Sequence, residues 1–168
     1  MLGKLFPGAA SFALGVAASS VALGQIDSVP QFNAYQSKTH DTNWATAPLH
    51  LDSAFAHQFR TRLREEAKLP PNFAGKYRLV QWGCGTTCIL GAVIDRKTGR
   101  IIPLPFSVCC SAAQDERFQA IEFRPDSRLI IFRGLRNEQG VDGTHFYTFD
   151  GHRFSFVKTV SVGTLPRQ

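Results

Sequence analysis

Between residues 76 and 160 the sequence alternates short runs of β-branched, aromatic and aliphatic residues with turns that contain glycine or proline. Runs of this kind are typical of β-strands, and short turns favour antiparallel neighbours. We expect strands at 76–82, 88–94, 100–104, 118–123, 128–133, 144–149 and 152–160, with a short extended run at 106–110. The predicted fold class is mainly β: an antiparallel meander of about seven strands, as an open sheet, a sandwich or a small barrel, with one N-terminal α-helix packed on it.

The clearest turn is Asp150-Gly151, which separates the last two expected strands. Dipeptides of this type form two-residue hairpin loops, and such a loop fixes the strand register. The expected pairs are Phe149 with His152, Tyr147 with Phe154, and His145 with Phe156. This register gathers three phenylalanines and a tyrosine on one face, which we expect to be buried.

The expected helix covers residues 53–68 and follows Asp52, a residue type that caps helix N-termini. Its apolar residues recur every four positions and so share one helical face. They are Phe55, Phe59, Leu63 and Ala67. Pro70-Pro71 ends the helix. The arginines at its other positions are interpreted as a solvated surface rather than a binding face.

Residues 1–24 have the pattern of a secretory signal peptide. Lys4 precedes an apolar stretch at 6–23, and the small residues Ala22 and Gly24 stand at the −3 and −1 positions of a cleavage site. A transmembrane anchor is the alternative, but the stretch is barely long enough to span a bilayer and is diluted by glycine, serine and proline. The pattern therefore favours cleavage of a Gram-negative-type signal and a periplasmic or secreted protein.

Cleavage would leave an irregular segment at 25–50 and a single disulfide-stapled β-rich domain at 51–168, with no stable membrane span. The formal net charge of the whole chain is +6. A basic chain usually suggests nucleic acid, but an exported protein meets little of it, so nucleic acid is not an expected partner. Anionic envelope polymers or lipid head groups are better candidates for long-range attraction, and solubility alone explains the charge equally well.

The chain has four cysteines, Cys84, Cys88, Cys109 and Cys110, and an even number in an exported protein favours disulfides. A bond between the two adjacent cysteines would close a strained ring. We therefore expect two bridges that join the 84/88 pair to the 109/110 pair, each closing a loop of about 20 residues and adding about 3 kcal/mol. A four-thiolate metal site is less favoured, because C-x3-C is not a typical zinc spacing.

Three short patterns surround the first cysteine pair: NFAGKY at 72–77, WGCGTTC at 82–88, and Asp95 followed by Thr98-Gly99. Together they resemble a family of small exported bacterial proteins with an NFAG-Y, WGCG--C and D--TG pattern and no known activity. The resemblance covers residues 59–105. It implies export and β-hairpins, but no activity.

Three interpretations compete for the WGCGTTC turn. The favoured one is structural, because glycines permit a sharp turn and the cysteines cross-link it. As a binding site it would use Trp82, Gly83, Gly85, Thr86 and Thr87. An exposed Trp82 could anchor a partner there, whereas a buried one is part of the core.

The third interpretation is a reactive Cys84 thiolate activated by His145 or His152. The sequence has no thioredoxin-like or papain-like signature, no histidine spacing typical of metal ligands and no phosphate-binding loop. We therefore assign no catalytic residue, metal ligand or cofactor.

The sequence favours a non-catalytic binding module for an envelope component or another protein, with the turn at 83–87 and the glycine-rich loop at 134–143 as the surfaces to test. The alternatives are a thiol-dependent enzyme acting on cell-wall or protein substrates, and a structural subunit of an envelope assembly.

Overall fold

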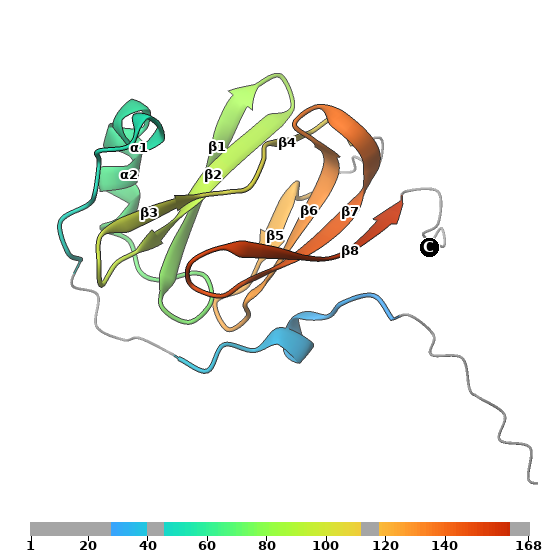
Figure 1. Cartoon of the computed structure of the whole chain (residues 1–168), viewed down its shortest axis with the longest axis horizontal. Coiled ribbons are helices and arrows are strands. Elements are labelled where there is room, and N and C mark those ends of the chain that lie inside the picture. Colours follow the sequence, from blue (N-terminus) through green and yellow to red (C-terminus); the bar gives the residue numbers. More distant parts are fainter. Residues whose placement is uncertain (1–27, 40–45, 112–117, 162–168) are drawn as a thin grey trace, which may run out of the picture.

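The computed structural model describes residues 28–39, 46–111 and 118–161 (Figure 1). The predicted signal peptide at 1–24 lies outside the described residues. The elements are η1 (Phe32–Tyr35), α1 (Ala54–Gln58), α2 (Arg60–Glu66), β1 (Tyr77–Gly85), β2 (Cys88–Asp95), β3 (Arg100–Pro103), β4 (Val108–Cys109), β5 (Ile121–Phe123), β6 (Leu129–Arg136), β7 (Gln139–Phe149) and β8 (Phe154–Ser161). The fold of this part of the chain is mainly β, with an open antiparallel sheet of eight strands and two α-helices. No helix in it is long and apolar enough to cross a membrane.

The short strand β4 joins two halves of the sheet. The strand order is β1-β2-β4-β6-β7-β8, with β3 paired to β2 and β5 paired to β6. β4 pairs with β2 at Ile89↔Val108 and with β6 at Cys109↔Leu135. In Figure 1, β1–β3 therefore form one half and β5–β8 the other, with β4 between them.

The inner core lies between the two halves. Alternate residues of each strand enter it, as the period of two along a strand requires. Its buried members are Phe73, Ala74, Tyr77, Leu79, Val93, Leu104, Val108, Ile121, Ile130, Phe132, Tyr147 and Phe149. Because both halves contribute, formation of this core requires contacts between segments that are far apart in sequence.

Two smaller clusters cover the outer faces of the sheet. On the first half, Val80, Trp82 and Ile94 pack under α1 and α2. On the second half, Phe32 of η1 packs on Leu129 and Phe146. The N-terminal part of the chain therefore supplies the cover for both outer faces.

The single helix expected at 53–68 is instead two helices that meet at Phe59. Phe59 ends α1 and begins α2 with a non-helical backbone (φ −103°, ψ 16°). Its ring packs against Trp82 with the centroids 4.7 Å apart, a tertiary contact that competes with helical continuity. The N-cap is also corrected: Ser53, not Asp52, accepts a hydrogen bond from the amide of Ala56 at 3.1 Å.

The register expected for the last hairpin is wrong by two residues. The structure pairs Phe149 with Phe154 and Tyr147 with Phe156. The connection is longer than a two-residue loop because the Asp150 carboxylate accepts hydrogen bonds from the amides of His152 and Arg153. A shift by two keeps the same side chains on one face, although Phe156 is 57% exposed there.

A bulge between Phe146 and Tyr147 shifts the remaining register by one residue, so that His145 lies opposite Thr159 instead of Phe156. His152 lies in the turn before β8, where its Nδ1 is 2.8 Å from a guanidinium nitrogen of Arg100. The two histidines therefore do not share the hairpin face.

Candidate binding site at the disulfide-bonded hairpin tip

The connection between β1 and β2 is an exposed hairpin tip, residues 83–87, closed by a disulfide between Cys84 and Cys88. Gly85 has φ +148° and Thr87 φ +58°. These left-handed angles allow the chain to reverse within a few residues. The tip is therefore a compact, cross-linked protrusion at one end of the sheet.

The disulfide pairing expected from the sequence is wrong. The structure joins Cys84 to Cys88 and Cys109 to its neighbour Cys110, and no cysteine is free. Cys110 follows the end of β4 with φ +59°, so the chain leaves the strand there and the two adjacent side chains can meet. Neither bridge closes a loop of about 20 residues, so the stabilisation expected from such loops is not obtained.

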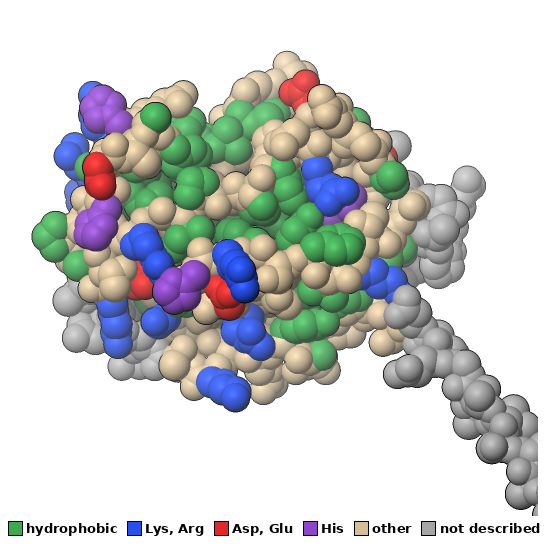
Figure 2. Space-filling view, in the orientation of Figure 1, with side chains coloured by type: hydrophobic (Ala, Val, Ile, Leu, Met, Phe, Trp, Pro, Cys, Tyr) green, Lys and Arg blue, Asp and Glu red, His purple; other side chains and the backbone are tan. Residues whose placement is uncertain are grey.

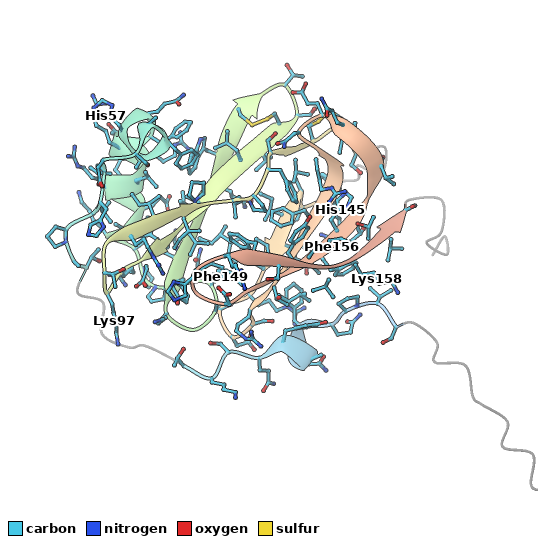
Figure 3. The ribbon with its side chains drawn as sticks, in the orientation of Figure 1. His57, Lys97, His145, Phe149, Phe156 and Lys158 are labelled. Carbon is cyan, nitrogen blue, oxygen red and sulfur yellow. A yellow bond between two sulfur atoms is a disulfide. The ribbon has the colours of Figure 1, made fainter. Side chains whose placement is uncertain are left out.

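The end of β4 lies beside the hairpin tip. The Oγ1 atom of Thr87 is 3.9 Å from the Sγ atom of Cys110. Gly134 of β6 brings the second half of the sheet close to this point, because a Cβ atom at Gly134 would overlap the carbonyl oxygen of Cys109. Figure 3 shows both disulfides as yellow bonds, one in the tip and one beside β4.

A groove of about 650 Å³ opens between this tip and β5. Its lining residues are Gln81, Trp82, Thr87, Ile89, Phe118, Gln119, Ala120, Ile121 and Phe123. Ile121 belongs to the inner core, and Ile89, Ala120 and Phe123 pack against it. The groove is therefore a place where the inner core reaches solvent between the two halves of the sheet.

The lining of this groove combines apolar side chains with uncharged polar ones. Gln81, Thr87 and Gln119 are exposed at its edges and provide two amides and a hydroxyl. None of the lining residues that the structure describes is charged. Such a surface suits a ligand with apolar groups and amide hydrogen-bonding groups.

Trp82 is a core residue. It is only 6% exposed, and its ring packs against those of Phe55 and Phe59. The Arg62 guanidinium lies 5.8 Å from its ring centroid. By this burial Trp82 joins the helices to the sheet and is not available as an exposed anchor.

Of the other four residues expected at the binding turn, the structure places only one in the groove. Gly83, Gly85, Thr86 and Thr87 are all exposed at the tip, but only Thr87 also lines the groove. The opposite wall, residues 118–123, was not among the expected site residues. Its alternating pattern predicts a strand, but no local feature indicates that this strand lies opposite the tip.

The Cys84–histidine pair of the third interpretation is not formed. The sulfur of Cys84 is bonded to Cys88. His145 is fully buried, with Nε2 2.8 Å from the carbonyl oxygen of Gly134 and Nδ1 2.8 Å from the hydroxyl of Thr159. All four sulfurs are held in disulfides, so they also form no four-thiolate metal site.

A second cavity, of about 430 Å³, lies at the other end of β1, where Tyr77 and Gly151 contribute to its lining. Three basic residues, Lys38, Lys76 and Arg128, line it together with Asp150. In contrast to the groove, this cavity is basic. Figure 2 shows lysine and arginine side chains mainly over the left and lower parts of the visible face, with hydrophobic side chains between them.

No protein-family model matches this chain, and no curated protein or solved structure has a significant similarity to it.

Proposed function

We propose that this protein is an exported binding module that holds an extended segment of another protein in the groove between the hairpin tip and β5. The observation that carries the proposal is the uncharged, partly apolar lining of a groove of about 650 Å³. That volume is within the range of about 300–1,000 Å³ that is usual for ligand sites.

The strand arrangement favours an extended peptide as the ligand. Among the described residues β5 pairs with β6 alone, so its other edge has no strand beside it. Residues 118–121 and Phe123 all line the groove, which therefore follows this strand. A peptide can add to such an edge through main-chain hydrogen bonds and place alternate side chains in the groove.

The two disulfides support the export that forms part of the proposal. Disulfides persist in oxidising compartments and are rare in the cytosol. Sequencing the N-terminus of protein recovered from a bacterial periplasm tests this part. Export with cleavage predicts a chain that starts at Gln25, and retention in the cytoplasm would contradict it.

The binding proposal is tested with a phage-displayed library of short random peptides, panned against the oxidised, full-length exported protein. We expect enriched peptides rich in apolar and amide side chains. The substitution Gln119→Glu replaces a neutral amide at the edge of the groove with a carboxylate and should weaken binding of the selected peptide by about tenfold or more. Gln139→Glu makes the same change at an exposed position outside the groove and should leave the affinity unchanged.

Two results would contradict the proposal. One is a selection that enriches no peptide. The other is a selected peptide whose affinity falls equally for Gln119→Glu and Gln139→Glu, or for neither.

The basic cavity supports a second candidate function, the binding of an anionic envelope polymer. Lys38, Lys76 and Arg128 offer positive charge at one place, as an anionic ligand requires. Binding to a polyuronate should then weaken with added salt and with Lys76→Gln, while Gln119→Glu should have no effect. Salt-insensitive binding, or no binding, would argue against this candidate.

A further inference from the structure

Each disulfide joins one exposed cysteine to one buried cysteine. Cys84 and Cys110 are exposed, whereas Cys88 is 8% and Cys109 3% exposed. Dithiol–disulfide exchange requires that an external thiolate reach one sulfur of the bond, and one exposed cysteine in each disulfide permits this. Both exposed cysteines are at the same end of the sheet, within reach of one partner.

The two buried cysteines are neighbours across a strand pair. β2 and β4 are antiparallel, and Ile89 lies opposite Val108. Extending this register by one residue would place Cys88 opposite Cys109. Directly opposed residues in antiparallel strands have Cα atoms about 4.5–5.5 Å apart, which is within the range that a disulfide spans. Thr87, the neighbour of Cys88 in the chain, has its hydroxyl 3.9 Å from the Cys110 sulfur, so the hairpin tip and the adjacent disulfide are in contact.

Cross-linking of distant segments does not account for these bridges. One closes a ring between adjacent residues, and the other closes a hairpin that its own strand pairing already holds. The gain from restricting the unfolded chain is smallest for such short loops. We therefore consider thiol–disulfide exchange, rather than stabilisation of the fold, as the reason for this arrangement of the sulfur atoms.

We propose that the four cysteines form a two-disulfide relay that accepts two electrons from a dithiol of another molecule at Cys110 and passes them to Cys84 and Cys88. The relay rests on the cysteines alone and does not depend on the peptide-binding groove. Its resting state is the pairing in the structure.

The first exchange reduces the adjacent pair. One thiolate of the external dithiol attacks the Sγ atom of Cys110, a mixed disulfide forms, and Cys109 leaves as a thiolate. The second sulfur of the dithiol, after losing its proton, attacks the external sulfur of the mixed disulfide and releases Cys110 as a thiolate. The external dithiol is now a disulfide, oxidised by two electrons, and its two protons are available to the reduced pair.

The second exchange is internal. The Cys109 thiolate attacks the Sγ atom of Cys88, which breaks the Cys84–Cys88 bond and releases the Cys84 thiolate to the exposed surface. The Cys110 thiolate then attacks Cys109, which restores the original adjacent disulfide and releases Cys88. The reduced pair has moved from 109/110 to 84/88. An acceptor that carries a disulfide can reoxidise it by the same chemistry.

The relay is tested by treating the oxidised full-length exported protein with one equivalent of dithiothreitol, stopping the exchange with acid and N-ethylmaleimide, and mapping all four cysteines by mass spectrometry. We expect label on Cys84 and Cys88, together with peptides in which Cys88 is linked to Cys109. Untreated protein should contain neither. This measurement requires no variant, so it does not depend on whether a cysteine substitution folds.

A double variant, Cys109→Ala with Cys110→Ala, gives the matched comparison. Dithiothreitol should reduce its Cys84–Cys88 bond several-fold more slowly than that of the wild type, because the entry point is gone. Failure to trap any Cys88–Cys109 species in the wild type, with reduction confined to one pair, would overturn the relay.

Discussion

His145 and Trp82 are both buried and both have ring nitrogens that can form hydrogen bonds. Whether these nitrogens have partners determines how each residue affects stability. The carbonyl oxygen of Gly134 can only accept, so His145 donates through Nε2 and accepts through Nδ1 from the Thr159 hydroxyl. This is the neutral imidazole. Burial disfavours the charged form and lowers the pKa of His145 below 6.5, a shift that the Gly134 carbonyl opposes.

The lowered pKa of His145 predicts that stability falls in acid. As pH falls through about 6.5, His145 in the unfolded chain binds a proton while the folded form does not, so the free energy of unfolding decreases. The decrease ends below the folded-state pKa, where both states are protonated. Its slope for one such group is at most about 1.4 kcal/mol per pH unit.

Urea unfolding between about pH 5 and pH 8 measures this slope. His145→Gln should flatten the curve in the acid range. His57→Gln alters an exposed histidine of α1, labelled in Figure 3, and should keep the wild-type slope. A wild-type slope in His145→Gln would show that another group is responsible.

Trp82 predicts a stability effect of a different kind. Trp82→Ala removes the ring between the helices and the sheet and should lower the free energy of unfolding by about 3–5 kcal/mol. Trp82→Phe should cost less, because it keeps an aromatic ring and removes the buried Nε1–H group, which has no hydrogen-bond partner among the described residues. A loss below about 1 kcal/mol in Trp82→Ala would mean that Trp82 is not part of the core.

At the scale of elements, one buried hydroxyl makes several of the hydrogen bonds that connect the N-terminal strap to the sheet. The strap is residues 28–39, and the Ser127 Oγ atom lies 2.9 Å from the carbonyl oxygen of Phe32 and 3.2 Å from that of Tyr35. It also accepts from the amide of Leu129 at 3.2 Å. Ser127 thus connects the strap to the start of β6.

Replacing this hydroxyl should loosen the strap without unfolding the sheet. Ser127→Ala leaves buried backbone groups without a partner, which should cost about 1–3 kcal/mol. Hydrogen exchange should quicken at the amides of Ser37 and Arg128, which bond across the contact between the strap and the domain. Ser155→Ala, at an exposed position on β8, is the control and should change neither quantity. Unchanged exchange in Ser127→Ala would refute this role.

The elements also show what the sequence could and could not predict. The strands expected at 88–94 and 128–133 correspond to β2 and β6, because their composition and flanking turns are local signals. The helix break at Phe59 depends on Trp82, which lies more than 20 positions further along the chain. The hairpin register depended on the hydrogen bonds of the Asp150 carboxylate, which a dipeptide pattern does not show.

The groove was beyond prediction for a related reason. Its two walls belong to different halves of the sheet, and the two-residue strand β4 connects these halves beside the hairpin tip. From the sequence, a bond between the adjacent cysteines is not expected, because such a bond closes a strained ring. The left-handed backbone of Cys110, which the sequence does not show, allows that bond.

At the scale of the molecule, the two halves are joined at both ends. β4 connects them beside the hairpin tip. At the far end, Arg100 of β3 donates to the carbonyl oxygen of Gly151 and contacts His152 in the turn between β7 and β8. With both ends fixed, the groove between the tip and β5 is held open by the fold itself, and a ligand would enter a largely preformed site.

The most direct test of the binding proposal is hydrogen–deuterium exchange of the exported protein with and without a saturating concentration of the selected peptide. We predict slower amide exchange in residues 81–89 and 118–123 together, the two walls of the groove, with no change in α1 and α2. Protection at the basic cavity or on the helices instead, or on one wall alone, would contradict the assignment of the groove as the binding site.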